Sequence, residues 1–409
     1  MTITQYWGAK AKTEAFTGQP EIRSLCSAGR ARLDSIDLLR GLVMILMALD
    51  HTRDFFGTSG INPRDVAEPA LFLTRWITHF CAPIFIFLAG LSAYLYGTRG
   101  RSTADVSRFL LTRGFWLILL EFTLVRFGWG FSVNLNFFVA QVIWVIGASM
   151  VVLAGLVFLP RWAIAAVALT MIAGHNLLDG IRPEQLGAAG WLWNLLHQPG
   201  LLQLAPQTRL LTLYSLIPWI AVMAAGYVCG PVFKLDPLSR RRFLLAAGSA
   251  VIAGFIALRA TNLYGDPAAW RVQSDWLGTV LSFVNCEKYP PSLLYLMMTL
   301  GPALIVLALF ERAHGALAGW IIVFGRVPFF FYVAHIYLIH ALAVAMAWAM
   351  FGDASWLLGQ FPPQKPAAWG LDLLGIYAVW LCVVVLLYPL CRWFASIKQR
   401  RREWWWSYL

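Results

Sequence analysis

The sequence predicts an all-α protein, a polytopic transmembrane helix bundle of about ten spans with both termini in the cytosol. Hydrophobic residues make up 59% of its 409 residues and charged residues only 13%, whereas a soluble domain carries about 45–50% apolar and about 25% charged residues. The apolar residues also gather in stretches of about 20, the length that crosses a bilayer as a helix. The composition therefore argues against a cytosolic globular enzyme.

Ten apolar stretches follow one another along the chain. Their approximate limits are 36–57, 70–97, 104–127, 136–158, 161–178, 211–233, 242–262, 291–310, 328–350 and 370–394. The count becomes nine or eleven if the apolar pieces 191–196 or 317–324 enter the membrane. We expect the membrane domain to cover residues 35–395, between a disordered cytosolic tail over 1–34 and a basic, aromatic cytosolic tail over 396–409.

The basic residues predict the orientation of the bundle. With the N-terminus in the cytosol, 22 of the 32 Lys and Arg residues fall on cytosolic segments and helix ends. Positive charge is enriched on the cytosolic side of membrane proteins. The net charge of +12 is thus explained by membrane topology, and we expect no nucleic-acid partner.

Several common site motifs are absent from the sequence. The six cysteines are far apart, without a CxxC or a Cys/His cluster, so we expect neither a disulfide framework nor a metal site. No P-loop, no GxSxG turn and no GxGxxG between a strand and a helix occurs. These absences argue against a nucleotide-driven pump and a soluble-type hydrolase.

The first apolar stretch carries the most informative polar residues. Arg40 and His51 are eleven positions apart, which in a helix is three turns plus about 20°, so they share one face roughly 16 Å apart along the axis. Asp50 and Asp54 adjoin His51. Ionisable residues at membrane depth are functional candidates. Read singly, Arg40 would snorkel to lipid phosphates and His51 would be an interfacial residue.

The next three stretches place polar residues at a depth similar to that of His51. His79 lies in the second stretch, four residues after Arg75, while Glu121 and Gln141 belong to the third and fourth. We therefore expect a base, a carboxylate and an amide to converge on one level. The alternative for Glu121 is a structural ion pair with Arg126 or Arg75.

Two later segments add further candidates. His335 and His340 are five positions apart in the ninth stretch, so they do not share a helix face, and one can face the bundle interior while the other bonds a neighbouring helix. Glu287 and Lys288 precede the eighth stretch, where they either belong to a rigid entry turn or line an acceptor site.

Two sequence blocks carry a family resemblance. "RLDSIDLLRGLVMILMALDHTRDFF" (32–56) and "FLTRWITHFCAPIFIFLAGLSAYL" (72–95) resemble the heparan-alpha-glucosaminide N-acetyltransferase catalytic family. The blocks "CEKYPPSLLYLMMTLGP" (286–302) and "GRVPFFFYVAHIYLIHAL" (325–342) resemble its bacterial members. The ten residues between Arg40 and His51 also match the motif of acyltransferase family three, which acylates bacterial surface sugars.

The resemblance implies an integral membrane acyltransferase of the bacterial inner membrane. An acyl group, with acetyl as the expected one, would pass from cytosolic acyl-CoA to a glycan or lipid-linked sugar at the outer face. His51 would be the base or the acyl carrier, as the family-three motif implies, with Asp50 or Asp54 orienting its ring. The lysosomal relatives have Asn at the position of His51 and a reactive His where this chain has Asn62, so His79 stays open as an alternative base.

The remaining roles follow from the same implication. Glu121 joins the catalytic candidates, and Arg40, Arg99 and Arg101 would hold the phosphates of acyl-CoA, because a guanidinium pairs well with phosphate. The co-substrate would be acetyl-CoA, with no metal, and membrane lipid would surround the protein. The rival function is a transporter or flippase for a lipid-linked or small polar substrate, and a scaffold without chemistry is a third.

Overall fold

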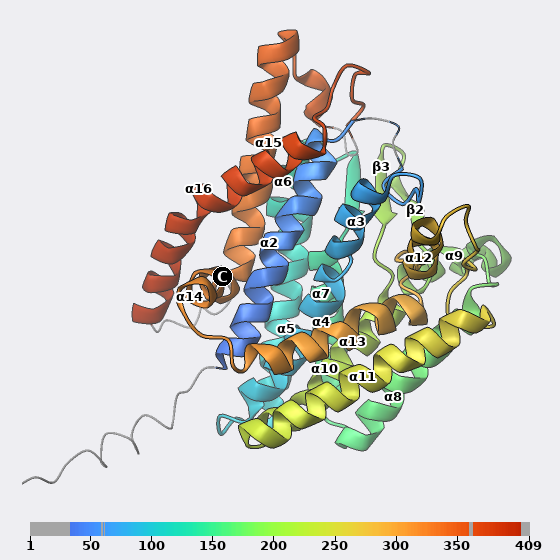
Figure 1. The fold of residues 1–409 in the computed structure, drawn as a ribbon, viewed down its shortest axis with the longest axis vertical. Helices are drawn as coiled ribbons and strands as arrows, with labels where there is room; N and C mark the ends of the chain where they lie inside the picture. The colour runs from blue at the N-terminus through green and yellow to red at the C-terminus, as the bar shows by residue number, and fades with distance from the viewer. Residues whose placement is uncertain (1–32, 59, 61, 360–362, 402–409) are drawn as a thin grey trace, which may run out of the picture. The chain divides into compact units, whose positions relative to one another are not determined.

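The computed structural model describes residues 33–58, 60, 62–359 and 363–401. Within this part, the chain is mostly helical, with a single small sheet (Figure 1). Seven described helical segments are long and apolar enough to cross a membrane: 69–97, 161–178, 216–234, 237–261, 293–310, 328–351 and 373–400. The protein is thus a multi-pass, predominantly α-helical membrane protein.

Each of the ten predicted stretches contains helix. The α-helices are α2 (Asp34–Phe56), α3 (Pro69–Thr78), α4 (Cys81–Gly97), α5 (Thr103–Leu120), α6 (Arg126–Gly130), α7 (Val142–Leu156), α8 (Arg161–Gly174), α9 (Gly190–Leu196), α10 (Leu216–Cys229), α11 (Pro237–Thr261), α12 (Trp276–Val284), α13 (Leu293–Phe310), α14 (Ala316–Arg326), α15 (Pro328–Phe351) and α16 (Leu373–Arg400). Shorter pieces are the π-helix η1 (Glu121–Val125) and the 3-10 helices η2 (His175–Leu178), η3 (Pro183–Ala189), η4 (Gly230–Lys234) and η5 (Ser355–Leu357). The number of spans stays a prediction, because α2 and α5 carry charges and α7 and α14 are short.

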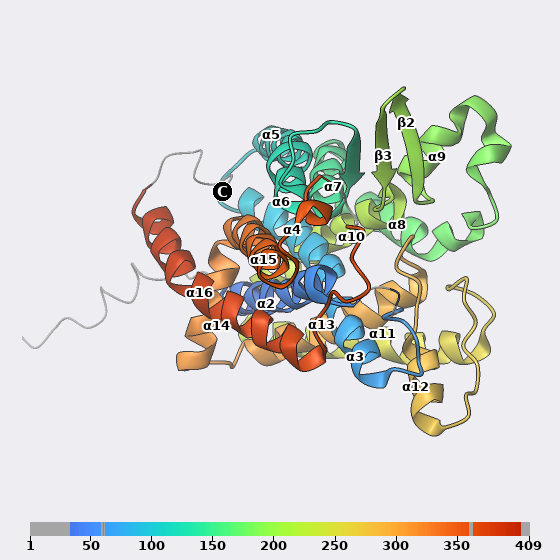
Figure 2. The same cartoon turned by 90° about the horizontal axis from the view of Figure 1, so that it is seen from above.

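The helix α2 is the centre of the bundle. It packs against α3, α4, α13, α14, α15 and α16, and the view in Figure 2 shows it surrounded by them. Glycines allow the closest of these approaches. A Cβ at Gly41 would lie 2.1 Å from the Ile321 carbonyl oxygen on α14, and one at Gly325 would lie 1.8 Å from that of Asp37. Small residues commonly bring membrane helices together in this way.

The second predicted stretch is broken into α3 and α4 at His79 and Phe80. Pro83 lacks the N–H that would bond to the His79 carbonyl one turn earlier. That carbonyl accepts a hydrogen bond from the Tyr295 hydroxyl on α13 instead, at 2.7 Å. The break therefore fixes where α3 ends beside α2 and ties it to the bundle.

A three-stranded sheet follows the third stretch. Its strands are β1 (Phe137–Ala140), β2 (Gly200–Ala205) and β3 (Thr208–Thr212), in the order β1-β3-β2. The strands β2 and β3 form an antiparallel hairpin, whereas β1 pairs with β3 in parallel, with Ala140 opposite Thr212. The Ala140 carbonyl also accepts the N–H of Tyr214, at 3.3 Å. The sheet thereby places Gln141 beside Tyr214.

The predicted tails lie largely outside the described residues. This applies to residues 1–32 and 402–409. The last helix, α16, continues to Arg400, so the first residues of the predicted C-terminal tail are helical. The cytosolic location of both termini stays a prediction.

Candidate functional site

A cavity lies beside the C-terminal half of α2, with about 390 Å³ of space not occupied by atoms, including the open solvent at its mouth. Residues from α2, the α3–α4 region, the start of α7 and two loops contribute to its wall. The lining residues are Met47, Asp50, His51, Thr78, Cys81, Ala82, Phe85, Gln141, Val142, Tyr214 and Lys288. Two of the predicted catalytic residues, Asp50 and His51, thus face one chamber.

His51 forms a hydrogen-bonded pair with His335 of α15. Its Nδ1 lies 2.7 Å from His335 Nε2, and the two rings lie edge to edge, with centroids 4.9 Å apart and planes inclined by 5°. His335 is fully buried and His51 is 9% exposed. The pair joins the first and ninth predicted stretches, and His335 is the histidine of α15 that faces the bundle interior.

The hydrogen-bond network assigns the tautomers of this pair. His335 Nδ1 lies 2.7 Å from the Phe331 carbonyl oxygen, which can only accept, so this nitrogen carries the proton. In the neutral ring the other nitrogen, Nε2, then accepts from the N–H at His51 Nδ1. His51 Nε2 is left with a lone pair. Among the described residues, no hydrogen bond engages it, so it is the nitrogen equipped to act as a base or nucleophile.

Aromatic rings enclose the histidine pair. Trp129 meets the His51 ring edge to face, with centroids 4.8 Å apart, and Tyr332 does so at 6.0 Å. Phe331 stacks on His335 at 5.0 Å. Such apolar walls keep bulk water away from the pair, which strengthens any electrostatic interaction formed there.

Neither predicted aspartate orients the His51 ring directly, which corrects that expectation. Asp50 binds Arg53 at 2.9 Å and Arg75 of α3 at 2.5 Å, and Asp54 binds Arg53 at 2.6 Å. The buried charge of Asp50 requires charged partners, and Arg53 also reaches Asp54, whose side chain is 36% exposed. His335 holds the ring instead, while Asp50 joins α2 to α3.

His79, the alternative base, lies outside the wall of the cavity. It is 4% exposed at the α3–α4 break, and its ring meets Tyr295 edge to face at 5.6 Å. Its Nδ1 has no hydrogen-bond partner among the described residues. Asn62, at the position of the relatives' reactive histidine, is exposed and caps a turn through the Arg64 N–H. Among the described histidines, His51 alone combines a hydrogen-bonded ring with a place in the cavity wall.

Glu121 caps the start of α7. The carboxylate, 2% exposed, accepts the Trp144 backbone N–H at 2.7 Å, one of the N–H groups that a helix start leaves free. The anticipated ion pair with Arg126 or Arg75 is not formed, because Arg126 bonds the Phe137 and Ser132 carbonyls and Arg75 bonds Asp50. The π-helical turn η1 begins at Glu121, and such turns occur often at functional sites.

A second pocket adjoins the first through Gln141, which lines both. It has about 440 Å³ of space not occupied by atoms. The lining residues are Glu121, Arg126, Trp129, Gly130, Ser132, Phe137, Val139, Gln141 and Gly359. Trp129 also touches the His51 ring. His51 and Glu121, which we expected to converge with Gln141 on one level, therefore line two neighbouring pockets that share Gln141.

The predicted phosphate-binding arginines lie along α2 and after α4. Arg40 donates to Asp37 at 2.9 Å, to Ser92 at 3.1 Å and to the Gly325 carbonyl at 3.3 Å, so it joins α2 to α4 and α14. Arg99 and Arg101 are exposed after the end of α4. Arg101 lies over the ring of Tyr96, 4.2 Å from its centroid.

Two groups at this site are not singled out by the sequence: His335, the partner of His51, and Lys288, in the wall of the cavity. The sequence does not distinguish His335 from His340. In the structure, His340 bonds the carbonyls of Gly128 and Leu357 and thereby stabilises the fold. Lys288 lines the cavity as one of the alternatives anticipated, whereas Glu287 binds Arg64 at 2.9 Å. Although burial acts to raise it, the charges of Lys288 and Arg75 hold the pKa of Tyr289 below its usual value.

Comparison with known families gives one match. The model of a family described as heparan-alpha-glucosaminide N-acetyltransferase, catalytic, matches residues 32–261. The matched region covers more than half of the chain and runs from α2 through α11. The resemblance inferred from the first two apolar stretches is thus confirmed. No curated protein matches the sequence.

Proposed function

The chain belongs to the heparan-alpha-glucosaminide N-acetyltransferase catalytic family, and from this premise we propose that it transfers an acetyl group from cytosolic acetyl-CoA to a glycan or lipid-linked sugar at the outer face of the bacterial inner membrane. The observation that carries the proposal is the pair of His51 and His335, which leaves one nitrogen lone pair of His51 beside a cavity. Acyl transfer needs such a group to take the proton of the acceptor.

In direct transfer, His51 Nε2 removes the proton from an acceptor hydroxyl or amine while the acceptor attacks the thioester carbonyl. The carbon–sulfur bond then breaks, and the departing thiolate takes the proton from the imidazolium. In the other route, Nε2 attacks the carbonyl itself, the carbon–sulfur bond breaks and CoA leaves as the thiolate. The acceptor then attacks the acetyl group on Nε2, the carbon–nitrogen bond breaks, and the proton of the acceptor passes to the released imidazole. In both routes His335 keeps the Nδ1 proton of His51 directed away from the reacting side.

The groups around the cavity suit the charge that develops in this reaction. The tetrahedral intermediate carries an oxyanion, which is stabilised by donors fixed in place before the reaction. Lys288, Tyr214 and Gln141 line the cavity with His51 and are polar groups that could take this role. Since a thiolate also leaves the site, the ammonium of Lys288 would assist its departure as well.

The acceptor and donor would approach from different sides. The second pocket combines Trp129 and Phe137 with the polar groups of Glu121, Arg126 and Gln141, a mixture that suits the apolar face and the hydroxyl groups of a sugar. The exposed Arg99 and Arg101 would meet the phosphates of CoA from the cytosol, and Arg40 would lie deeper along the same route.

The test is release of CoA thiol from acetyl-CoA by the full chain in nanodiscs, with and without a cell-envelope glycan extract. We expect thiol release that depends on the extract and on His51. Label that stays on the protein without an acceptor would indicate the acyl-histidine route. If a well-folded wild-type protein releases no thiol under any condition, the proposal fails and a transporter becomes the better reading.

A further inference from the structure

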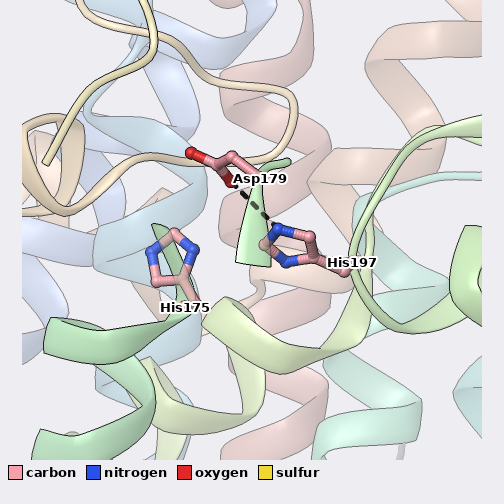
Figure 3. Close-up of side chains that lie close together, drawn as sticks. All are labelled: His175, Asp179 and His197. Carbon is pink, nitrogen blue, oxygen red and sulfur yellow. Dashed lines mark hydrogen bonds and ion pairs between the residues drawn. The ribbon is translucent and has the colours of Figure 1, made fainter. Parts of the chain in front are cut away.

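Three side chains of the types that bind metal ions lie close together, far in sequence from His51 and His335. His175 begins η2 at the end of α8, Asp179 follows that turn, and His197 follows α9. Figure 3 shows the three side chains converging from these segments. Each offers one ligand atom, and these atoms all lie within 4.8 Å of one another.

The buried nitrogens of this group lack partners. His175 is 1% exposed, and neither of its ring nitrogens has a hydrogen-bond partner within the described part of the chain. His197 is fully buried; its Nε2 lies 2.9 Å from Asp179 Oδ1, whereas its Nδ1 is also without a partner there. Buried polar groups without partners are costly. A cation that accepts lone pairs from both imidazole rings would remove part of this cost.

The carboxylate of Asp179 is prepared for a cation. Asn176 donates to Asp179 Oδ2 at 2.8 Å, and this contact fixes the orientation of the carboxylate. The Asp179 side chain is 25% exposed, which provides a path for an ion from solvent.

We propose that His175, Asp179 and His197 bind a divalent transition-metal ion, with zinc as the first choice. Two imidazoles and one carboxylate form a common zinc ligand set, in which water takes the fourth position. Binding would replace the contact between His197 and Asp179 with bonds from both groups to the ion. This proposal replaces the expectation of no metal, and it does not depend on the acyltransferase assignment.

The ion would stabilise the segment that connects the end of α8 to the sheet. Gln198 donates to the Asp179 carbonyl at 3.1 Å, and Trp193 donates to that of Ile181 at 2.8 Å. On the other side, Asn176 accepts the Leu293 N–H of α13 at 2.9 Å. The strand β2 begins at Gly200, three residues after His197. A metal at this point would therefore hold α8, α9 and the hairpin together.

The experiment measures zinc bound to the full chain in nanodiscs. The protein is stripped with a chelator, equilibrated with zinc, desalted and analysed by elemental mass spectrometry, and the affinity is measured by competition with a chromophoric chelator. The variants are His175→Gln and Asp179→Asn. The matched control is His314→Ala, because His314 is exposed and bonds only the Arg312 carbonyl among the described residues.

We expect about one zinc per chain in the wild type and the control. Because groups that merely orient ligands already change metal affinity about 10–100-fold, loss of a ligand should weaken zinc binding by about 100-fold or more. Cobalt in place of zinc should give visible absorption bands typical of a four-coordinate site in the wild type and the control, and not in the His175→Gln and Asp179→Asn variants. Wild-type protein that retains no zinc, or variants that bind it as tightly as the control does, would overturn the proposal. Measurement on the wild type does not depend on whether a variant folds.

Discussion

Two groups of buried histidines differ in how their ring nitrogens are used. In the first, His335 has both nitrogens engaged, and its partner His51 has one engaged and one facing a cavity. In the second, neither nitrogen of His175 has a hydrogen-bond partner among the residues that the structure describes, and His197 has one nitrogen engaged, against the carboxylate of Asp179. The first arrangement leaves a single nitrogen lone pair in a fixed direction. The second leaves several possible ligand atoms close to one another.

The difference shows that burial alone does not identify the role of a histidine. A base or nucleophile needs one available nitrogen and a partner that fixes the tautomer. A histidine that binds a metal ion needs other side chains able to bind the same ion within a few ångströms. His340 is the third case, since the carbonyls of Gly128 and Leu357 engage both nitrogens, and it serves the fold. The partners of each ring therefore separate three roles.

The largest effect is expected from His51→Ala. A positioned acid or base contributes about 10²–10⁴-fold to a rate, so CoA release should fall by that factor. Zinc content should stay at the wild-type level, because His51 belongs to the other histidine group. His314→Ala provides the control for removal of an imidazole. A His51→Ala protein with full turnover would remove the distinction between the two groups.

The next effect concerns the aspartates that adjoin His51. Asp50→Asn should lower the free energy of unfolding by about 3–5 kcal/mol, because it leaves Arg53 and Arg75 without their buried partner. Asp54→Asn is the matched control: its side chain is 36% exposed, and such pairs contribute about 1 kcal/mol or less. Thermal unfolding in detergent measures both. Equal losses would mean that the link between α2 and α3 is not the role of Asp50.

A smaller effect on turnover is expected from His335→Ala. A misplaced catalytic group can cost about 100-fold, so kcat should fall by about that factor, while KM for acetyl-CoA stays constant. His335→Gln keeps an acceptor for the Nδ1–H of His51 and should recover part of the rate. A purely structural role would instead give equal losses of folded protein in both variants, and steady-state kinetics on folded protein separates the two results.

The smallest effect is expected from the exposed arginines after α4. Exposed charge pairs contribute about 0.2–1 kcal/mol, so Arg99→Ala and Arg101→Ala should each raise KM for acetyl-CoA roughly two- to fivefold. Neither kcat nor zinc content should change. Arg108→Ala, another exposed arginine, is the control. A kcat effect of either variant would place these residues at the chemistry rather than at the phosphates.

Much of the fold is predictable from the sequence, because apolar length and period mark membrane helices directly. Every predicted stretch contains helix, and the membrane class follows from composition. The breaks are harder to anticipate. The interruption at His79 depends on Pro83 and on a hydroxyl from α13, and the sheet depends on pairing between Phe137–Ala140 and a hairpin more than sixty residues later.

The site is predictable in part, because sequence spacing reports neighbours only within one helix. The spacing singles out His51 and Asp50. It cannot show that Asp50 forms an ion pair with Arg75, or that the His51 ring is hydrogen-bonded to His335, 284 residues away. The same limit applies to the proposed metal site: His175 and Asp179 have the i,i+4 spacing of metal ligands, yet His197 joins them only after α9 folds back.

The central claim is acyl transfer across the membrane through His51, and sidedness tests it most directly. Full-length protein is reconstituted in sealed proteoliposomes with envelope glycan extract inside, and acetyl-CoA labelled in the acetyl group is added outside. We predict that label accumulates on glycan inside the vesicles with the wild type and not with His51→Ala. Label that remains on CoA, or that reaches glycan only when both share one compartment, would contradict the account.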